Sequence, residues 1–167
     1  MIFVRAARMA DLPSITGIHN HYVLHTHITF DVEPWTPGDR VTWFEEHSGE
    51  GRYRTLVACD DAGTVLGYTC TGRFRTKEAY DTTVEASIAC RPDRVGHGIG
   101  KLLYGALFDA IADQDINRIV AGIAQPNPAS NRLHEGFGFK PIGLFSEVGR
   151  KLGKYWDVLW MERPLKA

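Results

Sequence analysis

The stretch 84–111, VEASIACRPDRVGHGIGKLLYGALFDAI, decides the fold of this chain of 167 residues. Apolar residues alternate along its first seven positions, and this period of two predicts a β-strand over Val84–Cys90. Pro92 ends the strand, because proline has no N–H to donate to the ladder and favours a turn. From Ile99 to Ile111 apolar residues recur every three or four positions, which predicts a helix packed on a sheet.

The segment between strand and helix is rich in glycine, with the sequence Gly96-His97-Gly98-Ile99-Gly100. Glycine is favoured where the backbone takes a positive φ or approaches a ligand closely. Free N–H groups and the helix dipole just before a helix attract an anion, so the loop suits a pyrophosphate. The plain alternative is a tight turn. A dinucleotide fold is disfavoured, because G-x-G-x-G differs from G-x-G-x-x-G and lies in mid-chain.

Length and composition indicate a single domain, residues 1–167, with a core of its own. Its 19 Lys and Arg residues face 20 Asp and Glu residues, whereas nucleic-acid binders usually carry a basic excess. Cys59, Cys70 and Cys90 are widely spaced and form no CxxC pair, so we expect reduced thiols and no structural zinc. With no signal sequence and no apolar run of membrane-spanning length, we expect a soluble, cytoplasmic protein without membrane or nucleic-acid partners.

The rest of the chain supplies helices and strands on either side of this unit. Helices are expected from Asp11 to Tyr22, from Pro37 to His47 and from Ser130 to Glu135. Strands are expected at Ile2–Arg5, Thr55–Cys59, Val65–Thr71 and Arg118–Ala124, with two more within Pro141–Pro164 around Gly149–Gly153. Asp60–Gly63 indicates a hairpin turn, while His25–Trp35 and Gly72–Asp81 are expected to be loops. The predicted class is α/β, with a mixed (α+β) central sheet flanked by helices on both faces.

This element order, with a glycine loop between the fourth strand and the third helix, resembles the GNAT N-acetyltransferases. The resemblance is most specific at residues 127–139, NPASNRLHEGFGF, which are similar to the pattern N-x-x-S-x-x-L-H-E-x-x-G-F. With Thr83-Val84-Glu85 and 148–158, VGRKLGKYWDV, it resembles one branch, the phosphinothricin and methionine sulfoximine N-acetyltransferases. The resemblance covers essentially the whole chain. It implies the GNAT acyl-CoA N-acyltransferase fold, acetyl-CoA as co-substrate, no metal and a homodimer.

The glycine loop departs from the family pattern at one position. The acetyl-CoA signature of the family is Q/R-x-x-G-x-G/A, and Val95 stands at its Gln/Arg position, with Arg94 one residue earlier. Most phosphate contacts in such a loop come from backbone N–H groups, so we expect the loop to bind pyrophosphate nonetheless.

Two side chains are candidates for proton transfer. By resemblance, Glu85 is the general base that takes a proton from the substrate ammonium, and partial desolvation would raise its pKa toward the working range. The alternative is an outward-facing strand glutamate. His134 lies on the short helix where many GNAT enzymes carry a tyrosine that protonates the leaving thiolate, and histidine transfers protons near neutral pH. The alternative is a histidine that packs over the cofactor cleft. Tyr104 is disfavoured as the acid because it falls within the packed helix.

The resemblance also assigns an acetyl-CoA site. The strand residues expected to meet the pantetheine arm are Ile88, Ala89 and Cys90. The pyrophosphate is assigned to Gly96, His97, Gly98, Ile99, Gly100 and Lys101, although an exposed helix lysine is an equal alternative for the last. Asn127 resembles the family asparagine that bonds the pantetheine arm, and Ser130 follows it. A turn residue and a helix cap are their plain alternatives.

The acceptor side is assigned to the loop before the central strand. Arg75, Lys77 and Tyr80 lie there, and the branch uses this loop to hold its amino acid. Arginine suits a bidentate carboxylate or phosphinate contact, and lysine supplies a point charge. Phe30 resembles an aromatic wall of the same pocket. Solvated loop charges and core packing are the alternatives.

The predicted function is acetyl-CoA-dependent N-acetylation of the α-amino group of a small amino-acid analogue: phosphinothricin, methionine sulfoximine or methionine sulfone. The amine, deprotonated through Glu85, attacks the thioester directly. A non-catalytic, acyl-CoA-binding regulatory GNAT domain and a protein or peptide N-acetyltransferase stay open as alternatives. A metal site on His21 and His25 is disfavoured, because no acidic partner or second histidine pair accompanies them.

Overall fold

The computed structural model, which describes residues 1–47 and 50–166, contains a seven-stranded mixed sheet. Its strands are β1 (Ile2–Ala6), β2 (Thr55–Asp60), β3 (Val65–Arg73), β4 (Thr83–Cys90), β5 (Arg118–Ala124), β6 (Lys140–Lys151) and β7 (Lys154–Pro164). The helices are α1 (Leu12–His25), α2 (Asp39–His47), α3 (Ile99–Ala110) and α4 (Pro128–Gly136). Three single-turn 3₁₀ segments join them: η1 (Met9–Asp11), η2 (Glu78–Tyr80) and η3 (Pro92–Arg94).

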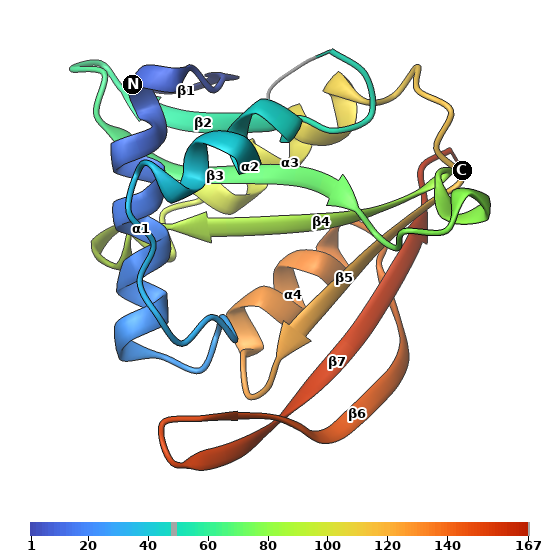
Figure 1. Cartoon of the computed structure of the whole chain (residues 1–167). Coiled ribbons are helices and arrows are strands. Elements are labelled where there is room, and N and C mark those ends of the chain that lie inside the picture. The colour runs from blue at the N-terminus through green and yellow to red at the C-terminus, as the bar shows by residue number, and fades with distance from the viewer. Residues whose placement is uncertain (48–49, 167) are drawn as a thin grey trace.

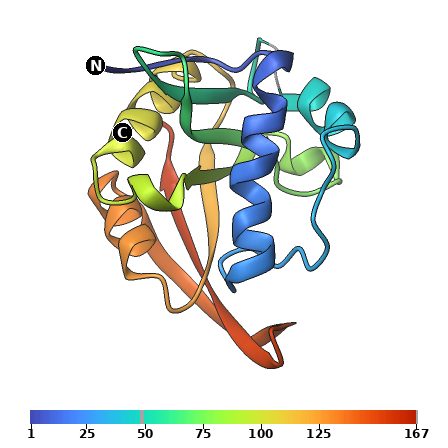
Figure 2. The same ribbon diagram turned by 90° about the vertical axis from the view of Figure 1, so that its left-hand side faces the viewer.

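The strands follow the order β1-β2-β3-β4-β5-β7-β6, and β4 with β5 is the parallel pair among antiparallel neighbours. Helices α1 and α2 cover one face of the sheet, while α3 and α4 cover the other (Figures 1 and 2). The chain reaches β5 from β4 through α3, because parallel neighbours need a crossover connection. The predicted mixed sheet with helices on both faces is therefore confirmed.

The largest apolar cluster joins the central strands to α3. Leu107 of this helix and its C-cap residue Ile111 are fully buried against Val84 of β4 and Ile119 of β5. Burial of one such side chain contributes roughly 1.5–3 kcal/mol, so the apolar stripe of the helix fixes its orientation. The first turn of α3 is held in the same way, since Ile99 packs on β2 and β3. The amino end of α3 is thereby anchored at the carboxyl end of β4.

The hairpin turn predicted at residues 60–63 is present between β2 and β3. Gly63 has a φ of +82°, and the Asp60 carboxylate accepts hydrogen bonds from the backbone N–H groups of Ala62 and Thr64. The second hairpin differs from the expectation around Gly149–Gly153. Gly149 stays within β6, and the turn lies at Leu152-Gly153, where both residues have positive φ, +53° and +73°. Two such residues match the twist of an antiparallel pair.

The β6–β7 hairpin projects from the body of the sheet (Figure 1). β6 is the edge strand, and most of its side chains are exposed, including Ile142, Leu144, Phe145 and Val148. No helix in the described part of the chain is long and apolar enough to cross a membrane.

Candidate active site

The central feature of the site is a split in the sheet between β4 and β5. The parallel pairing covers only Thr83 with Arg118, Val84 with Ile119 and Glu85 with Val120. Beyond Glu85 the two strands separate toward their carboxyl ends (Figure 1). Main-chain groups inside a sheet are normally paired, so the open wedge offers unpaired donors and acceptors to a ligand that lies between the strands.

The alternation of main-chain groups tells which residues of β4 face the wedge. Arg91 N–H donates to Leu66 O, on the β3 side, so the main-chain groups of Ile88 and Cys90 face the opposite side. The hydroxyl of Tyr22 donates to Cys90 O at 2.6 Å and occupies that carbonyl. Ile88 therefore presents both main-chain groups to the wedge, Cys90 presents its N–H, and Ala89 is directed toward β3.

The glycine loop has the backbone that the sequence predicted. Gly96 and Gly98 have φ of +85° and +79°, and Gly98 is the N-cap of α3. The first N–H groups of a helix have no partner within it, and those of Ile99 and Gly100 lie at this end. Lys101 is exposed in the first turn, and His97 is exposed in the loop. The loop thus combines free N–H groups with a helix dipole, which suits an anion.

Gly100 allows α3 to approach α4 closely. A Cβ at this position would lie 3.1 Å from Leu133 Cδ2 of α4 and 3.8 Å from Ile88 Cδ1 of β4. The glycine loop, the β4 edge and α4 therefore converge at one end of the wedge.

α4 begins two residues earlier than expected, at Pro128, and Asn127 rather than Ser130 is its N-cap. The side-chain oxygen of Asn127 accepts a hydrogen bond from Ser130 N–H at 3.2 Å. The plain alternative for Asn127, a residue of the turn into the helix, therefore holds, while Ser130 lies within the first turn of α4 and is not the cap. The side-chain NH₂ group of Asn127 is not used by this bond.

His134 lies inside the protein, only 3% exposed. Its Nδ1–H donates to Ser130 O at 2.8 Å, and its Nε2 accepts from the Tyr104 hydroxyl at 2.8 Å. Burial lowers the pKa of His134, while the Ser130 carbonyl opposes that shift. The ring is therefore neutral with both nitrogens occupied, which favours the packing alternative over the acid. Sequence reasoning placed Tyr104 in the core but did not find this bond.

Glu85 is the last residue of β4 that pairs with β5, and its side chain is half-buried. Burial raises the pKa of Glu85, and the charge of Arg75 partly opposes the shift. A carboxylate with a raised pKa is a better proton acceptor near neutral pH. Burial also raises the pKa of the Cys90 thiol to about 11, so this cysteine stays protonated and is a poor nucleophile.

The loop between β3 and β4 borders a cavity of about 510 Å³. Its lining consists of Phe74, Arg75, Thr76, Lys77 and Tyr80. The Arg75 guanidinium lies 4.8 Å from the centre of the Phe74 ring, and the Phe74 and Tyr80 rings meet edge to face. The structure thus brings together the three loop residues that the sequence assigned to the acceptor.

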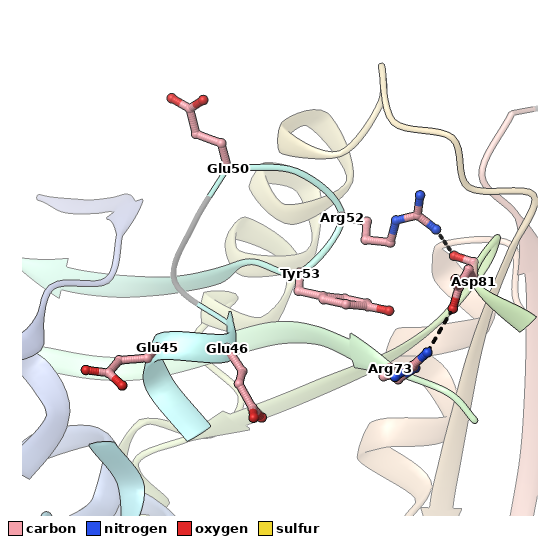
Figure 3. Close-up of a pocket in the computed structure, with 7 residues that line it drawn as sticks. All are labelled: Glu45, Glu46, Glu50, Arg52, Tyr53, Arg73 and Asp81. Atoms are coloured by element: carbon pink, nitrogen blue, oxygen red, sulfur yellow. Dashed lines mark hydrogen bonds and ion pairs between the residues drawn. The ribbon is translucent and has the colours of Figure 1, made fainter. Parts of the chain in front are cut away.

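An ion pair and a hydrogen bond close the base of this loop, as Figure 3 shows. Arg73, at the end of β3, lies 3.3 Å from the Asp81 carboxylate just before β4. Arg52 donates to the main-chain oxygen of Asp81 from a neighbouring loop. These residues also border a second cavity of about 500 Å³ that Glu45, Glu46, Glu50 and Tyr53 complete. The ends of the acceptor loop are therefore fixed, while its tip lines the first cavity.

Phe30 is not among the residues that line the first cavity. Its ring covers Gly149 of β6, where a side chain would collide with it. Beside it, the buried Lys151 donates to Thr29 O at 2.7 Å and to Tyr22 O at 3.4 Å. The segment after α1 is thus fastened to the β6–β7 hairpin. Sequence reasoning missed Lys151, which looked like a turn lysine next to Leu152-Gly153.

The histidines of α1 do not form part of a metal cluster. Within residues 1–47 and 50–166, no three His, Cys, Asp or Glu side chains are grouped as a metal ion would require. His21 and His25 lie on one helix face, with ring centres 5.0 Å apart. His19 instead bonds to Asp31 at 2.7 Å.

Comparisons with known proteins agree with this geometry. A model described as the acetyltransferase (GNAT) family matches residues 20–139. The chain is 51% identical over 163 residues to a phosphinothricin N-acetyltransferase of Streptomyces coelicolor, across 97% of this chain and 95% of the relative. It is 38% identical over 162 residues to an L-methionine sulfoximine/L-methionine sulfone acetyltransferase of Pseudomonas aeruginosa, across 97% and 94%. A solved GNAT superfamily phosphinothricin acetyltransferase from Sinorhizobium meliloti, in complex with AcCoA, matches with a TM-score of 0.92 and 35% identity, across 98% of this chain and 88% of that one.

Proposed function

Since the chain belongs to the acetyltransferase (GNAT) family and is an acetyl-CoA-dependent N-acetyltransferase, we propose that it acetylates the α-amino group of a small amino-acid analogue. The acceptors we propose are phosphinothricin, methionine sulfoximine and methionine sulfone, because relatives named for these substrates match almost the full chain. The observation that carries the proposal is the position of Glu85, a desolvated carboxylate at the closed end of the wedge and under the charge of Arg75.

The wedge and the glycine loop fit acetyl-CoA. Ile88 and Cys90 hold the pantetheine arm through their main chain, because their main-chain groups face the wedge. The loop 96–101 holds the pyrophosphate through the N–H groups at the start of α3. The NH₂ group of Asn127 supports the arm from the opposite side. Acetyl-CoA supplies the acetyl group in activated form, as a thioester.

Glu85 acts as the general base. Its raised pKa lets it accept a proton from the ammonium group of the acceptor, directly or through water, and the resulting amine is the nucleophile. The N–H groups that face the wedge polarise the carbonyl under attack. A free thiol has a pKa of about 8.5, so the thiolate leaves without a dedicated acid. We propose His134 as a packing residue rather than that acid, because both of its ring nitrogens are bonded inside the core.

The acceptor pocket is small and charged. A cavity of about 510 Å³ suits an amino acid. Burial raises the pKa of Glu85 and the charge of Arg75 partly opposes this rise, so the two side chains lie near each other. An amine at Glu85 has the α-carboxylate on the same carbon, and Arg75 pairs with that carboxylate. Lys77 adds positive charge, and Tyr80 closes the apolar side. Phe30 lies outside the lining of this cavity and packs on Gly149 of the β6–β7 hairpin.

We propose a homodimer that forms through β6. This edge strand has unpaired main-chain groups and exposes Leu144 and Phe145 to 54% and 52%. Exposed edge strands with apolar side chains pair readily with another strand, and a second copy offers the same strand in antiparallel orientation. We also propose that the protein works in the cytoplasm, since its three cysteines are free thiols.

The test is a thiol-release assay with acetyl-CoA and five acceptors: phosphinothricin, methionine sulfoximine, methionine sulfone, glutamate and a peptide. We expect turnover of the three analogues, and a fall in kcat of about 10²–10⁴-fold in Glu85→Gln. Glu78→Gln, on an exposed residue of the same loop, is the matched control and keeps full activity. Turnover of the peptide alone refutes the small pocket. Binding of CoA with no turnover of any acceptor favours a regulatory domain.

A further inference from the structure

His47, the last residue of α2, stands over the strand that neighbours Glu85. α2 packs against Tyr68 of β3, and Gly72 lies on the same face of that strand, four residues further on. Gly72 pairs directly with Glu85 of β4, and residues opposite one another on neighbouring strands share a face. A Cβ at Gly72 would lie 2.9 Å from His47 Nε2 and 3.4 Å from its Cδ2. The imidazole therefore fills the place of a side chain directly opposite Glu85.

The contacts of the imidazole determine which of its nitrogens is free. Nδ1 of His47 lies 2.5 Å from Trp43 O. A carbonyl oxygen can only accept a hydrogen bond, so Nδ1 carries the proton and the lone pair of the neutral ring is on Nε2. The Trp43 ring stacks on the imidazole with ring centres 4.9 Å apart, and the Tyr53 ring lies 6.4 Å away. These contacts hold Nε2 over Gly72.

Water reaches Nε2 of His47. Within residues 1–47 and 50–166 this nitrogen has no hydrogen-bond partner. The buried polar side-chain atoms that lack a partner there belong to Thr16, Arg40 and Trp160. His47 Nε2 is not one of them, so it keeps contact with solvent. Gly72 and Glu85 are likewise only half-buried, so the space between the imidazole and the carboxylate is open to water.

The span between the two side chains suits one bridging water. Residues directly opposite one another have Cβ atoms about 4.5–5.5 Å apart. Nε2 of His47 therefore lies at most roughly 8 Å from Glu85 Cβ, and the carboxylate extends from that Cβ. Burial raises the pKa of Glu85, and the charge of Arg75, three residues after Gly72, opposes the rise, so the carboxylate lies near this loop. A water bridges polar groups that are too far apart for a direct hydrogen bond.

Charged groups surround His47 without binding its free nitrogen. Glu85 and Arg75 lie toward the acceptor. The cavity of about 500 Å³ beside Tyr53 carries the other charged side chains, which Figure 3 shows: Glu45, Glu46, Glu50, Arg52, Arg73 and Asp81. In the part of the chain that the structure describes, none of them forms a hydrogen bond with Nε2. The lone pair of the neutral imidazole is therefore available to water.

We propose that His47 is a positioning residue whose neutral Nε2 accepts a hydrogen bond from the water that carries the proton of the acceptor to Glu85. This inference rests on the proposed function and deepens it, because it names the path of the proton. A water that donates one hydrogen to Nε2 and the other to the carboxylate directs a lone pair at the ammonium group. The ammonium gives a proton to this water while the water passes one to Glu85, and the carboxyl later releases it to solvent. The second proton of the amine leaves on the CoA thiol.

Protonation of His47 abolishes this role. The imidazolium is a donor at both nitrogens, so it cannot accept from the water, and its charge repels the ammonium group. The reaction therefore requires that Glu85 and His47 are both unprotonated. On the acid side, the logarithm of kcat/KM then falls with a slope of two against pH, whereas one essential base gives a slope of one.

The test is the thiol-release assay with methionine sulfone at saturating acetyl-CoA, from about pH 5 to 8, in the parent protein, His47→Gln and His47→Leu. Glutamine still accepts from water but does not ionise, so we expect kcat/KM within about threefold of the parent value and an acid slope of one. Leucine neither accepts nor ionises, and we expect kcat/KM to fall about tenfold, as the loss of one hydrogen bond implies, again with a slope of one. KM for acetyl-CoA stays unchanged in both variants.

His25→Gln is the matched control, since it removes an exposed histidine of α1 and keeps both the rate and the slope of two. A slope of two that persists in His47→Gln, a parent slope of one, or an unchanged kcat/KM in His47→Leu overturns the inference. A rise in KM for acetyl-CoA or a lower urea midpoint in His47→Gln assigns the residue a structural role and also overturns it. In each case turnover of the sulfone by the parent protein still supports the proposed function, whereas a parent protein without that turnover overturns both.

Discussion

The bond between Tyr104 and His134 decides whether His134 packs or catalyses, and Tyr104→Phe removes it. The hydroxyl donates to His134 Nε2 at 2.8 Å, and Tyr104 is fully buried. The carbonyl of Ser130 holds Nδ1–H, so the imidazole cannot reverse its tautomer to satisfy Nε2 elsewhere. Removal of the hydroxyl leaves a buried acceptor without a donor.

The expected loss of stability follows from the unpaired Nε2 of His134. An unsatisfied buried polar group costs about 1–3 kcal/mol, and the phenyl ring itself stays in place against Phe108 and Phe139. We therefore expect the free energy of unfolding to fall by about 2 kcal/mol. For a chain of this length that corresponds to a decrease in Tm of roughly 4–8 °C. We expect kcat to change less than twofold, because no ring nitrogen of His134 reaches a substrate.

Urea unfolding measures the free energy of unfolding, and an unchanged m value checks that the transition stays two-state. The thiol-release assay with methionine sulfone measures kcat. Tyr155→Phe is the matched control. Because Tyr155 is 58% exposed, the free energy of unfolding of this variant changes by less than about 0.5 kcal/mol. A fall in kcat of about a hundredfold with unchanged stability in Tyr104→Phe would refute the reasoning and make the pair a proton relay.

Three further outcomes are expected. Stability falls as pH drops below about 6.5, because burial lowers the pKa of His134 and the unfolded chain binds that proton first; urea midpoints across this range that stay level contradict it. Lys151→Met releases Thr29 O and raises KM for the acceptor, with KM for acetyl-CoA unchanged, whereas the exposed Lys154→Met changes neither. Leu144→Asp converts the proposed dimer to a monomer in sedimentation velocity, since a buried unpaired carboxylate is costly; a dimer that persists places the interface elsewhere.

The sequence predicts the strand, glycine loop and helix of residues 84–111 well, because each depends on a pattern within a short stretch of sequence. The alternation along 84–90, the glycines of the loop and the stripe of α3 depend on neighbours within a few residues, and β4, the loop and α3 all form there. The turn at 60–63 is predicted for the same reason, since an aspartate and a glycine satisfy it themselves.

Contacts between distant residues were not predictable in this way. The packing of whole strands determines the residue at which β4 stops pairing with β5. No residue type near Glu85 indicates that position in the sequence. Tyr104 and His134 are 30 residues apart. Their bond depends on the close approach of α3 to α4 at Gly100. The helix cap was expected at Ser130 and is Asn127 instead, because both residue types cap helices and only the backbone selects one.

The split between β4 and β5 explains how one glutamate serves two substrates in the proposed reaction. Main-chain groups of a strand lie in the plane of the sheet, while side chains stand perpendicular to it. A ligand bound to the main chain of Ile88 therefore approaches Glu85 within the sheet. An acceptor held by Arg75 approaches from the face that α1 and α2 cover, because the Glu85 side chain stands on that face. The two directions cross where the strands part, and Glu85 is the last paired residue there. A shift of β4 by one residue would turn its carboxylate into the α3 core, so the register of this strand is itself a requirement of catalysis.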